Sequence, residues 1–116
     1  MTDVSIYHNP RCSKSRQTLE ILQQHDINPE IILYLEMPPT EVQLKEILAL
    51  LNISARGLLR TSEAAYKENG LSDKTLPDSV LIKAMLSHPK LIERPIVLAN
   101  GKAALGRPPE NVLDII

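Results

Sequence analysis

Cys12, the one cysteine of the chain, is the residue whose chemistry stands out, because its neighbours are polar and basic. Arg11 precedes it, and Lys14 and Arg16 follow within four positions. Nearby cations lower the pKa of a thiol, and the thiolate is the form that acts as a nucleophile. A lone cysteine is often a small, inert core residue instead. A basic loop is a poor place for a core residue, so we predict that Cys12 is an exposed or half-exposed nucleophile.

The spacing around Cys12 excludes two kinds of thiol site. A cysteine phosphatase loop requires Cys-x5-Arg, but position 18 is Thr18. A dithiol redox motif requires Cys-x-x-Cys, but position 15 is Ser15. Any redox cycle must therefore use thiols from outside the chain. A single cysteine also excludes internal disulfides and cysteine-rich metal sites, and the three histidines match no common ligand spacing, so we predict no metal.

The elements around Cys12 place it between a strand and a helix. Residues 4–8 alternate β-favouring and polar side chains and end at Asn9-Pro10, which predicts a strand. Residues 13–25 lack Gly and Pro and predict a helix. The apolar residues 31–35 predict a second strand, buried on both faces of a parallel sheet. The sulfur of Cys12 should then face the free N–H groups of the first helical turn, where an anion is favoured.

The middle of the chain is predicted to be helical. Thr40 and Gln43 have the spacing of a capping box before an apolar stripe with helical periodicity. Ser54 and Asp78 are the expected N-caps of two further helices. The pattern therefore predicts a helical insertion at about residues 40–92.

The C-terminal part predicts a hairpin and a closing helix. Residues 96–99 and 102–105 flank Asn100-Gly101, a strong hairpin signal, and an apolar stripe over residues 112–116 follows Pro108-Pro109. The whole order is β-α-β, helices, β-β-α. It predicts an α/β, thioredoxin-like (glutaredoxin-like) fold whose βαβ and ββα halves flank the insertion. A length of 116 residues favours one domain, 1–116.

Three arginines are candidates for binding an oxyanion at Cys12, namely Arg60, Arg94 and Arg107. Guanidinium groups bind oxyanions through paired donors. In a thioredoxin-like fold the loop before the third strand faces the N-terminus of the first helix, so Arg94 should reach a ligand on Cys12. The Arg94-Pro95 bond is a candidate for the cis form. Ser15 is expected to donate a hydrogen bond to the thiolate.

The overall composition excludes several classes of function. Thirteen Lys and Arg against fourteen Asp and Glu give a net charge of −1, which offers no cationic surface for nucleic acid. The longest apolar runs, residues 31–35 and 47–51, are far shorter than the roughly 20 residues of a membrane span. The start of the chain does not have the pattern of a signal peptide. We expect a cytoplasmic protein that binds neither nucleic acid nor membrane.

Four segments, in order and with conserved spacing, resemble the glutaredoxin-dependent arsenate reductase family over essentially the whole chain. They are Tyr7 to Arg16 (YHNPRCSKSR), Leu33 to Glu36 (LYLE), Arg94 to Val97 (RPIV) and Gly106 to Pro108 (GRP). Ser13-Lys14 follows Cys12 where the best-known resistance enzymes have Gly-Thr. The chain therefore resembles the shorter branch of the family.

This resemblance implies an oxidoreductase of arsenic detoxification with a thioredoxin-like fold. The Cys12 thiolate would attack arsenate, glutathione would act as co-substrate and release arsenite, and glutaredoxin would reduce the remaining mixed disulfide. No bound cofactor is implied. The residues that match the family's site are the nucleophile Cys12, the thiolate-supporting His8 and Ser15, and the oxyanion-binding Arg60, Arg94 and Arg107.

Two other functions fit a single-cysteine domain of this fold. An Spx-like regulator would bind RNA polymerase, but such chains usually carry Cys-x-x-Cys, and Ser15 argues against that redox switch. A monothiol glutathione-dependent oxidoreductase would need fewer oxyanion-binding arginines, so Arg60 and Arg107 argue against it.

Overall fold

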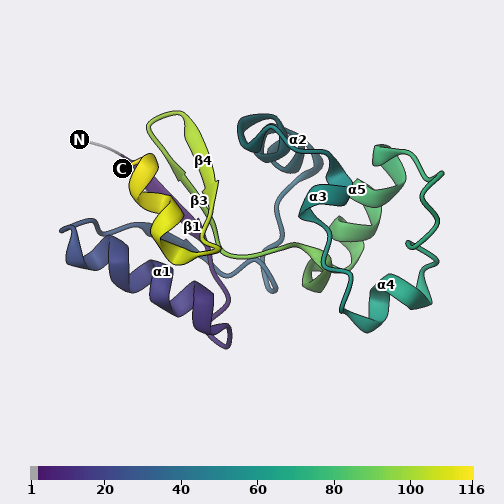
Figure 1. Cartoon of the computed structure of the whole chain (residues 1–116), viewed down its shortest axis with the longest axis horizontal. Helices are drawn as coiled ribbons and strands as arrows, with labels where there is room; N and C mark the ends of the chain where they lie inside the picture. Colours follow the sequence, from purple (N-terminus) through teal and green to yellow (C-terminus); the bar gives the residue numbers. More distant parts are fainter. Residues whose placement is uncertain (1–2) are drawn as a thin grey trace. The chain divides into compact units, whose positions relative to one another are not determined.

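A four-stranded sheet is assembled from the two ends of the chain, and helices occupy the middle (Figure 1). The structure is a computed structural model that describes residues 3–116. In chain order the elements are β1 (Val4–Tyr7), α1 (Ser13–Gln24), β2 (Glu30–Ile32), α2 (Glu41–Leu51), α3 (Ala55–Leu58), α4 (Ala64–Glu68), α5 (Asp78–Ser87), the 3-10 helix η1 (Pro89–Leu91), β3 (Ile96–Ala99), β4 (Lys102–Leu105) and the 3-10 helix η2 (Pro109–Asp114).

The sheet has the order β2-β1-β3-β4 and is mixed. Strand β1 pairs with β2 in parallel, whereas β1–β3 and β3–β4 are antiparallel pairs. These elements form the two predicted halves. One half is the parallel β1–β2 pair, connected by α1, and the other is the antiparallel β3–β4 hairpin, followed by η2. The α/β, thioredoxin-like prediction is therefore confirmed.

The core of the sheet unit, defined as residues up to 37 together with 94–116, is aliphatic. Helices α1 and η2 contact each other and pack against the sheet. Its buried side chains come from both helices and the central strands: Val4, Ile6, Leu22, Val97, Ala99, Val112 and Ile115. This packing fixes the start of α1, and therefore Cys12, against the sheet.

The second strand differs from its prediction in length and in burial. It spans Glu30–Ile32 instead of residues 31–35, and Ile31 is 47% exposed. The prediction of a strand buried on both faces is wrong, because β2 lies at the edge of the sheet and pairs only with β1. The chain then turns, with the carbonyl of Leu33 accepting hydrogen bonds from the N–H groups of Glu36 and Met37.

Residues 38–93 form a second compact unit, the helical unit. The capping box of α2 is confirmed: Thr40 Oγ1 accepts a hydrogen bond from the Gln43 N–H (3.1 Å), and Gln43 Oε1 accepts one from the Thr40 N–H (2.9 Å). Helix α2 ends at Asn52, which has a left-handed backbone (φ 56°). That residues 1–116 fold as one domain stays a prediction.

Asp78 does not cap its own helix as predicted. Pro77 is the N-cap of α5, and the Asp78 carboxylate instead accepts a hydrogen bond from the Ala55 N–H (3.3 Å) at the start of α3. Ser54 is the N-cap of α3, but its side chain makes no capping bond, so Asp78 satisfies this helix end from a distant part of the sequence. The short α4 was not predicted, and the closing helix is a 3-10 helix.

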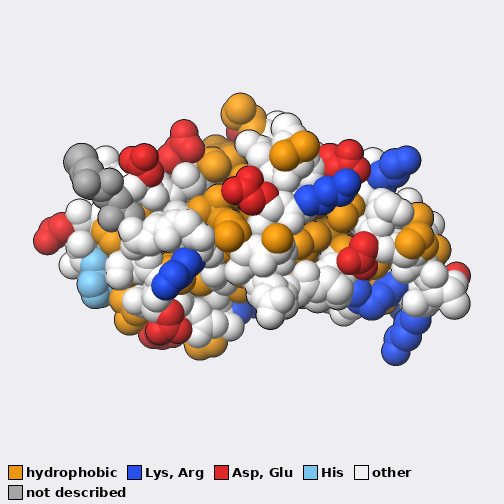
Figure 2. Space-filling view, turned by 90° about the horizontal axis from the view of Figure 1, so that it is seen from above, with side chains coloured by type: hydrophobic (Ala, Val, Ile, Leu, Met, Phe, Trp, Pro, Cys, Tyr) orange, Lys and Arg blue, Asp and Glu red, His pale blue; other side chains and the backbone are white. Residues whose placement is uncertain are grey.

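On the face shown in Figure 2, acidic and basic side chains are both present and lie among apolar side chains. This mixture of charges agrees with a net charge of −1. Within residues 3–116, no helix combines the length and the apolar character needed to span a membrane.

Candidate active site

Cys12 is the N-cap residue of α1, as the sequence predicts, with an extended backbone (φ −94°, ψ 124°). Its carbonyl accepts the first helical hydrogen bond, from the Arg16 N–H (3.0 Å). An N-cap side chain faces the N–H groups that have no partner within the helix. The backbone N–H groups of Ser15 and Lys14, in the first turn of α1, act on the sulfur by lowering the pKa of the Cys12 thiol.

The surroundings of Cys12 lower the pKa of its thiol below the ordinary value. Burial, the largest single effect, raises the pKa because it removes water from the thiolate. Four effects lower the pKa: the Ser15 N–H, a hydrogen bond from Arg94, the positive charge of Arg94, and the Lys14 N–H. Together they outweigh the effect of burial. The surroundings therefore make the thiolate easier to form than at a free cysteine.

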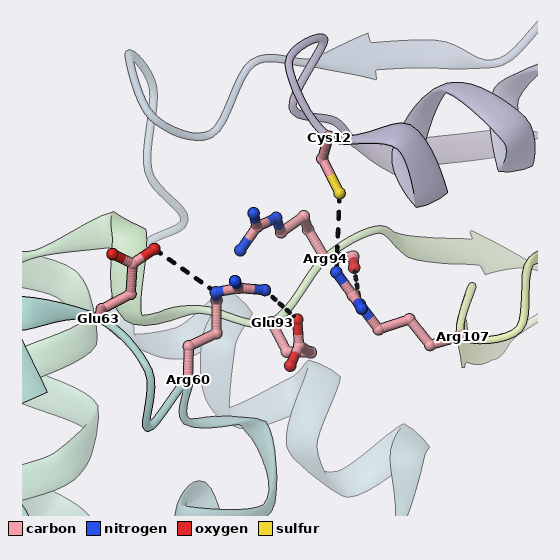
Figure 3. A network of polar contacts seen from close by, with 6 residues as sticks. All are labelled: Cys12, Arg60, Glu63, Glu93, Arg94 and Arg107. Carbon is pink, nitrogen blue, oxygen red and sulfur yellow. Dashed lines mark hydrogen bonds and ion pairs between the residues drawn. The ribbon is translucent and has the colours of Figure 1, made fainter.

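Arg94 and Arg107 approach the sulfur from the other end of the chain (Figure 3). The guanidinium of Arg94 hydrogen-bonds the Cys12 sulfur, and Arg107 Nη2 lies 3.7 Å from it. Arg107 is held in place because its Nε donates to the Arg94 carbonyl (2.8 Å). The Arg94-Pro95 bond, a candidate for the cis form, is cis, and the Arg107-Pro108 bond is also cis. Two guanidinium groups beside one thiolate can hold the oxygens of a bound oxyanion.

Cys12 is more buried than predicted. Only 8% of its surface is exposed, so the prediction of an exposed or half-exposed thiol is wrong. The reason is tertiary, because Arg94 and Arg107, which are distant in sequence, lie against the sulfur. Hydrogen bonds and positive charge therefore lower the pKa of this thiol in spite of its burial.

His8 and Ser15 form a buried pair behind the nucleophile. His8 Nδ1 and Ser15 Oγ are 2.7 Å apart, and both residues are at most 6% exposed. Burial and the positive charge of Arg16 lower the pKa of His8, so its ring is neutral near pH 7. The Ser15 hydroxyl, which was expected to donate to the thiolate, contacts His8 and accepts from the Asn9 N–H (3.0 Å). The backbone N–H of Ser15 is the group of this residue that lowers the pKa of the Cys12 thiol.

Asn9 shapes the loop that carries Cys12, a role that the sequence analysis missed. Its carbonyl accepts the Cys12 N–H (3.0 Å), and its Oδ1 accepts the Arg11 N–H (3.0 Å). Its own N–H donates to Ser15. The signal was present, because Asn before Pro favours such a turn, but it was interpreted only as the end of a strand.

Arg60, the third candidate arginine, belongs to the helical unit and is paired with two carboxylates there. Its Nη1 is 2.7 Å from Glu93 Oε1, and its Nε is 3.6 Å from Glu63 Oε1 (Figure 3). The sequence analysis identified neither glutamate. A role for Arg60 in binding an oxyanion stays a prediction.

The residues that the structure describes contain no cluster of three or more His, Cys, Asp or Glu side chains that could hold a metal ion.

One protein-family model covers almost the entire chain. The model of the ArsC family matches residues 7–115, a range that includes Cys12, Arg94 and Arg107. The chain belongs to the ArsC family. This confirms the resemblance drawn from the four sequence segments.

Three of the proteins that this chain resembles are similar over nearly their full length. The uncharacterized protein YfgD of Escherichia coli K12 is 54% identical over 97% of this chain and 96% of its own. An arsenate reductase of Neisseria meningitidis serogroup B is 50% identical over 97% of both chains. The solved structure of an arsenate reductase from Vibrio cholerae has 50% identity and a TM-score of 0.96, covering 99% of this chain and 98% of its own.

Proposed function

We propose that this chain is an arsenate reductase whose nucleophile is Cys12. The observation that carries the proposal is the contact of the Cys12 sulfur with Arg94 and Arg107 at the N-terminus of α1. This arrangement stabilises both a thiolate and the negative oxygens of its target. The names of relatives at about 50% identity support arsenate as that target.

In the proposed first step, the Cys12 thiolate attacks arsenic(V) and forms an S–As bond. One As–O bond breaks, and that oxygen leaves as water after protonation. Arg94 and Arg107 balance the charge of the remaining oxygens, and they do so most strongly where charge increases in the transition state. Neutral His8 and Ser15 fix the loop, so the N–H groups of α1 remain directed at the sulfur.

In the proposed second step, the thiolate of glutathione attacks the sulfur of Cys12. A disulfide forms between Cys12 and glutathione, the two electrons of the S–As bond remain on arsenic, and arsenic leaves as arsenite. Glutaredoxin then reduces the mixed disulfide with a further glutathione. The chain has no second cysteine with which to do this itself. From the family resemblance alone, we also assign Arg60 to oxyanion binding.

The proposal is tested by arsenate-dependent oxidation of NADPH, coupled through glutathione, glutathione reductase and glutaredoxin. Cys12→Ser should abolish turnover, and Arg94→Ala or Arg107→Ala should lower kcat/KM by roughly a hundredfold. The exposed Arg11 is the matched control, and Arg11→Ala should retain most of the activity. Reduction of mixed disulfides without arsenate turnover would instead indicate a monothiol oxidoreductase.

A further inference from the structure

Arg60 is held by two glutamates within the helical unit. Glu93 makes the shorter contact, at 2.7 Å to Nη1, and Glu63 lies 3.6 Å from Nε (Figure 3). The side chain of Arg60 is only 16% exposed, and those of Glu93 and Glu63 are 25% and 31% exposed. Charge pairs that are this buried are screened less by salt than surface pairs.

The backbone places Arg60 and Glu93 beside each other. The Arg60 N–H donates to the Leu91 carbonyl (2.7 Å), and the Glu93 N–H donates to the Leu58 carbonyl (2.9 Å). These bonds flank an antiparallel bridge between Leu59 and Ile92. The ion pair therefore joins two segments of fixed register and is not a chance contact between long surface side chains.

The charge at this position opposes the binding of an anion. One guanidinium between two carboxylates gives 1 − 2 = −1. An oxyanion that uses Arg60 needs N–H donors of the guanidinium, and Glu93 already occupies Nη1 through a short, charge-assisted bond. The oxyanion must therefore displace Glu93 or share the donor with it.

We propose that Glu93 is an internal competitor for Arg60 and thereby sets the affinity of the chain for oxyanions. The inference rests on the proposed function, because it takes Arg60 as an oxyanion ligand. Glu93 lowers the affinity for every anion, and a multiply charged oxyanion is better able to displace it than a singly charged one. Glu63 acts in the same direction through its longer contact, with a smaller effect.

The test measures the binding of arsenate and of sulfate by titration calorimetry in a Cys12→Ser background, in which no turnover consumes the ligand. Glu93→Gln keeps the shape of the side chain and removes its charge, and it should tighten both affinities by about threefold to tenfold. Glu63→Gln should have a smaller effect in the same direction. Glu68→Gln, an exposed residue of α4, removes the same charge and should change neither affinity by as much as twofold.

Arg60→Ala separates competition at Arg60 from a general effect of charge. In that background, Glu93→Gln should give no further gain in affinity. Unchanged or weaker binding by Glu93→Gln, or the same gain without Arg60, overturns the inference. Thermal melts of each variant show that loss of folding does not explain the result. Glu93→Gln could tighten binding although the protein with Cys12 intact does not turn over arsenate. That result supports the inference and overturns the proposed reaction.

Discussion

The sulfur of Cys12 is subject to two opposing effects. Burial of the side chain disfavours the thiolate, whereas two backbone N–H groups and the guanidinium of Arg94 favour it, and the balance lowers the thiol pKa. Arg11, Lys14 and Arg16 first suggested this activation from the sequence. In the structure, the groups that lower the thiol pKa are the N–H groups of Ser15 and Lys14 and the guanidinium of Arg94, which is more than eighty positions along the chain.

The first prediction concerns the reactivity of this thiol. Alkylation of Cys12 by iodoacetamide should have its pH midpoint below that of a free thiol, since only the thiolate reacts. Below that midpoint the rate should fall about tenfold per pH unit. Arg94→Ala should move the midpoint upward, because it removes a hydrogen bond and a positive charge from the sulfur. An equal shift in the control Arg11→Ala would show that general charge, not contact, sets the pKa.

The second prediction concerns His8, whose pKa is lowered mainly by burial. The unfolded chain gains a proton at this residue near the ordinary pKa of 6.5, whereas the folded chain resists protonation to lower pH. Stability from His8 should therefore be fully present above pH 6.5 and should be lost as the pH falls through the folded pKa.

Urea unfolding between pH 7.5 and pH 5 measures this dependence. The free energy of unfolding of the wild type should fall over that range, and His8→Gln should make the fall smaller. The exposed His25 is the matched control, and His25→Gln should retain the wild-type slope. Parallel curves for the wild type and His8→Gln would contradict the prediction.

At the scale of the elements, signals that involve only neighbouring residues predicted the structure well. The capping box at Thr40, the start of α1 at Ser13 and the turn at Asn100-Gly101 depend on contacts a few positions apart. Asn100 and Gly101 have positive φ values of 54° and 71°, which such a hairpin requires. Errors occurred where a distant segment intervened, as at Asp78, whose carboxylate binds the start of α3.

The third prediction tests the capping box. Thr40→Ala removes the side-chain acceptor of the Gln43 N–H and should lower the free energy of unfolding by about 1 kcal/mol. Thr61 is exposed and lies outside any helix or strand, so Thr61→Ala is a suitable control and should change stability by less than about 0.5 kcal/mol. Equal losses in the two variants, measured by urea unfolding, would show that the capping bond contributes nothing.

At the scale of the whole molecule, burial follows position in the sheet more than the hydrophobicity of a residue. Ile6 and Ile31 are register partners in the parallel β1–β2 pair. Ile6 is fully buried, whereas Ile31 is 47% exposed because its strand lies at the edge.

The fourth prediction compares these two isoleucines. Ile6→Ala should destabilise the protein by about 2–5 kcal/mol, because it leaves a cavity in the core of the sheet unit. Ile31→Ala, the same change in the neighbouring strand, should cost about 1 kcal/mol or less. Comparable losses in chemical unfolding would mean that β2 is covered in solution.

Most of the fold and part of the candidate site could be predicted from the sequence. The order of elements identified the thioredoxin-like fold, and the motifs around Cys12 identified the family. The partners of Arg60 could not be predicted, because Glu93 is 33 positions away and a single charged residue gives no signal of pairing. The prediction that β2 is buried on both faces was wrong, because an apolar run does not reveal whether a strand is central or at an edge.

By itself, the sequence determined that the chain has one thiol and predicted correctly that this thiol stands at the start of a helix. These conclusions depend on residue types and on spacings of a few positions. Only the tertiary structure decided that Arg94 and Arg107 contact the sulfur and that the Ser15 hydroxyl faces His8. Such contacts arise when the sheet brings together residues that are distant in sequence, and local propensity carries no information about them.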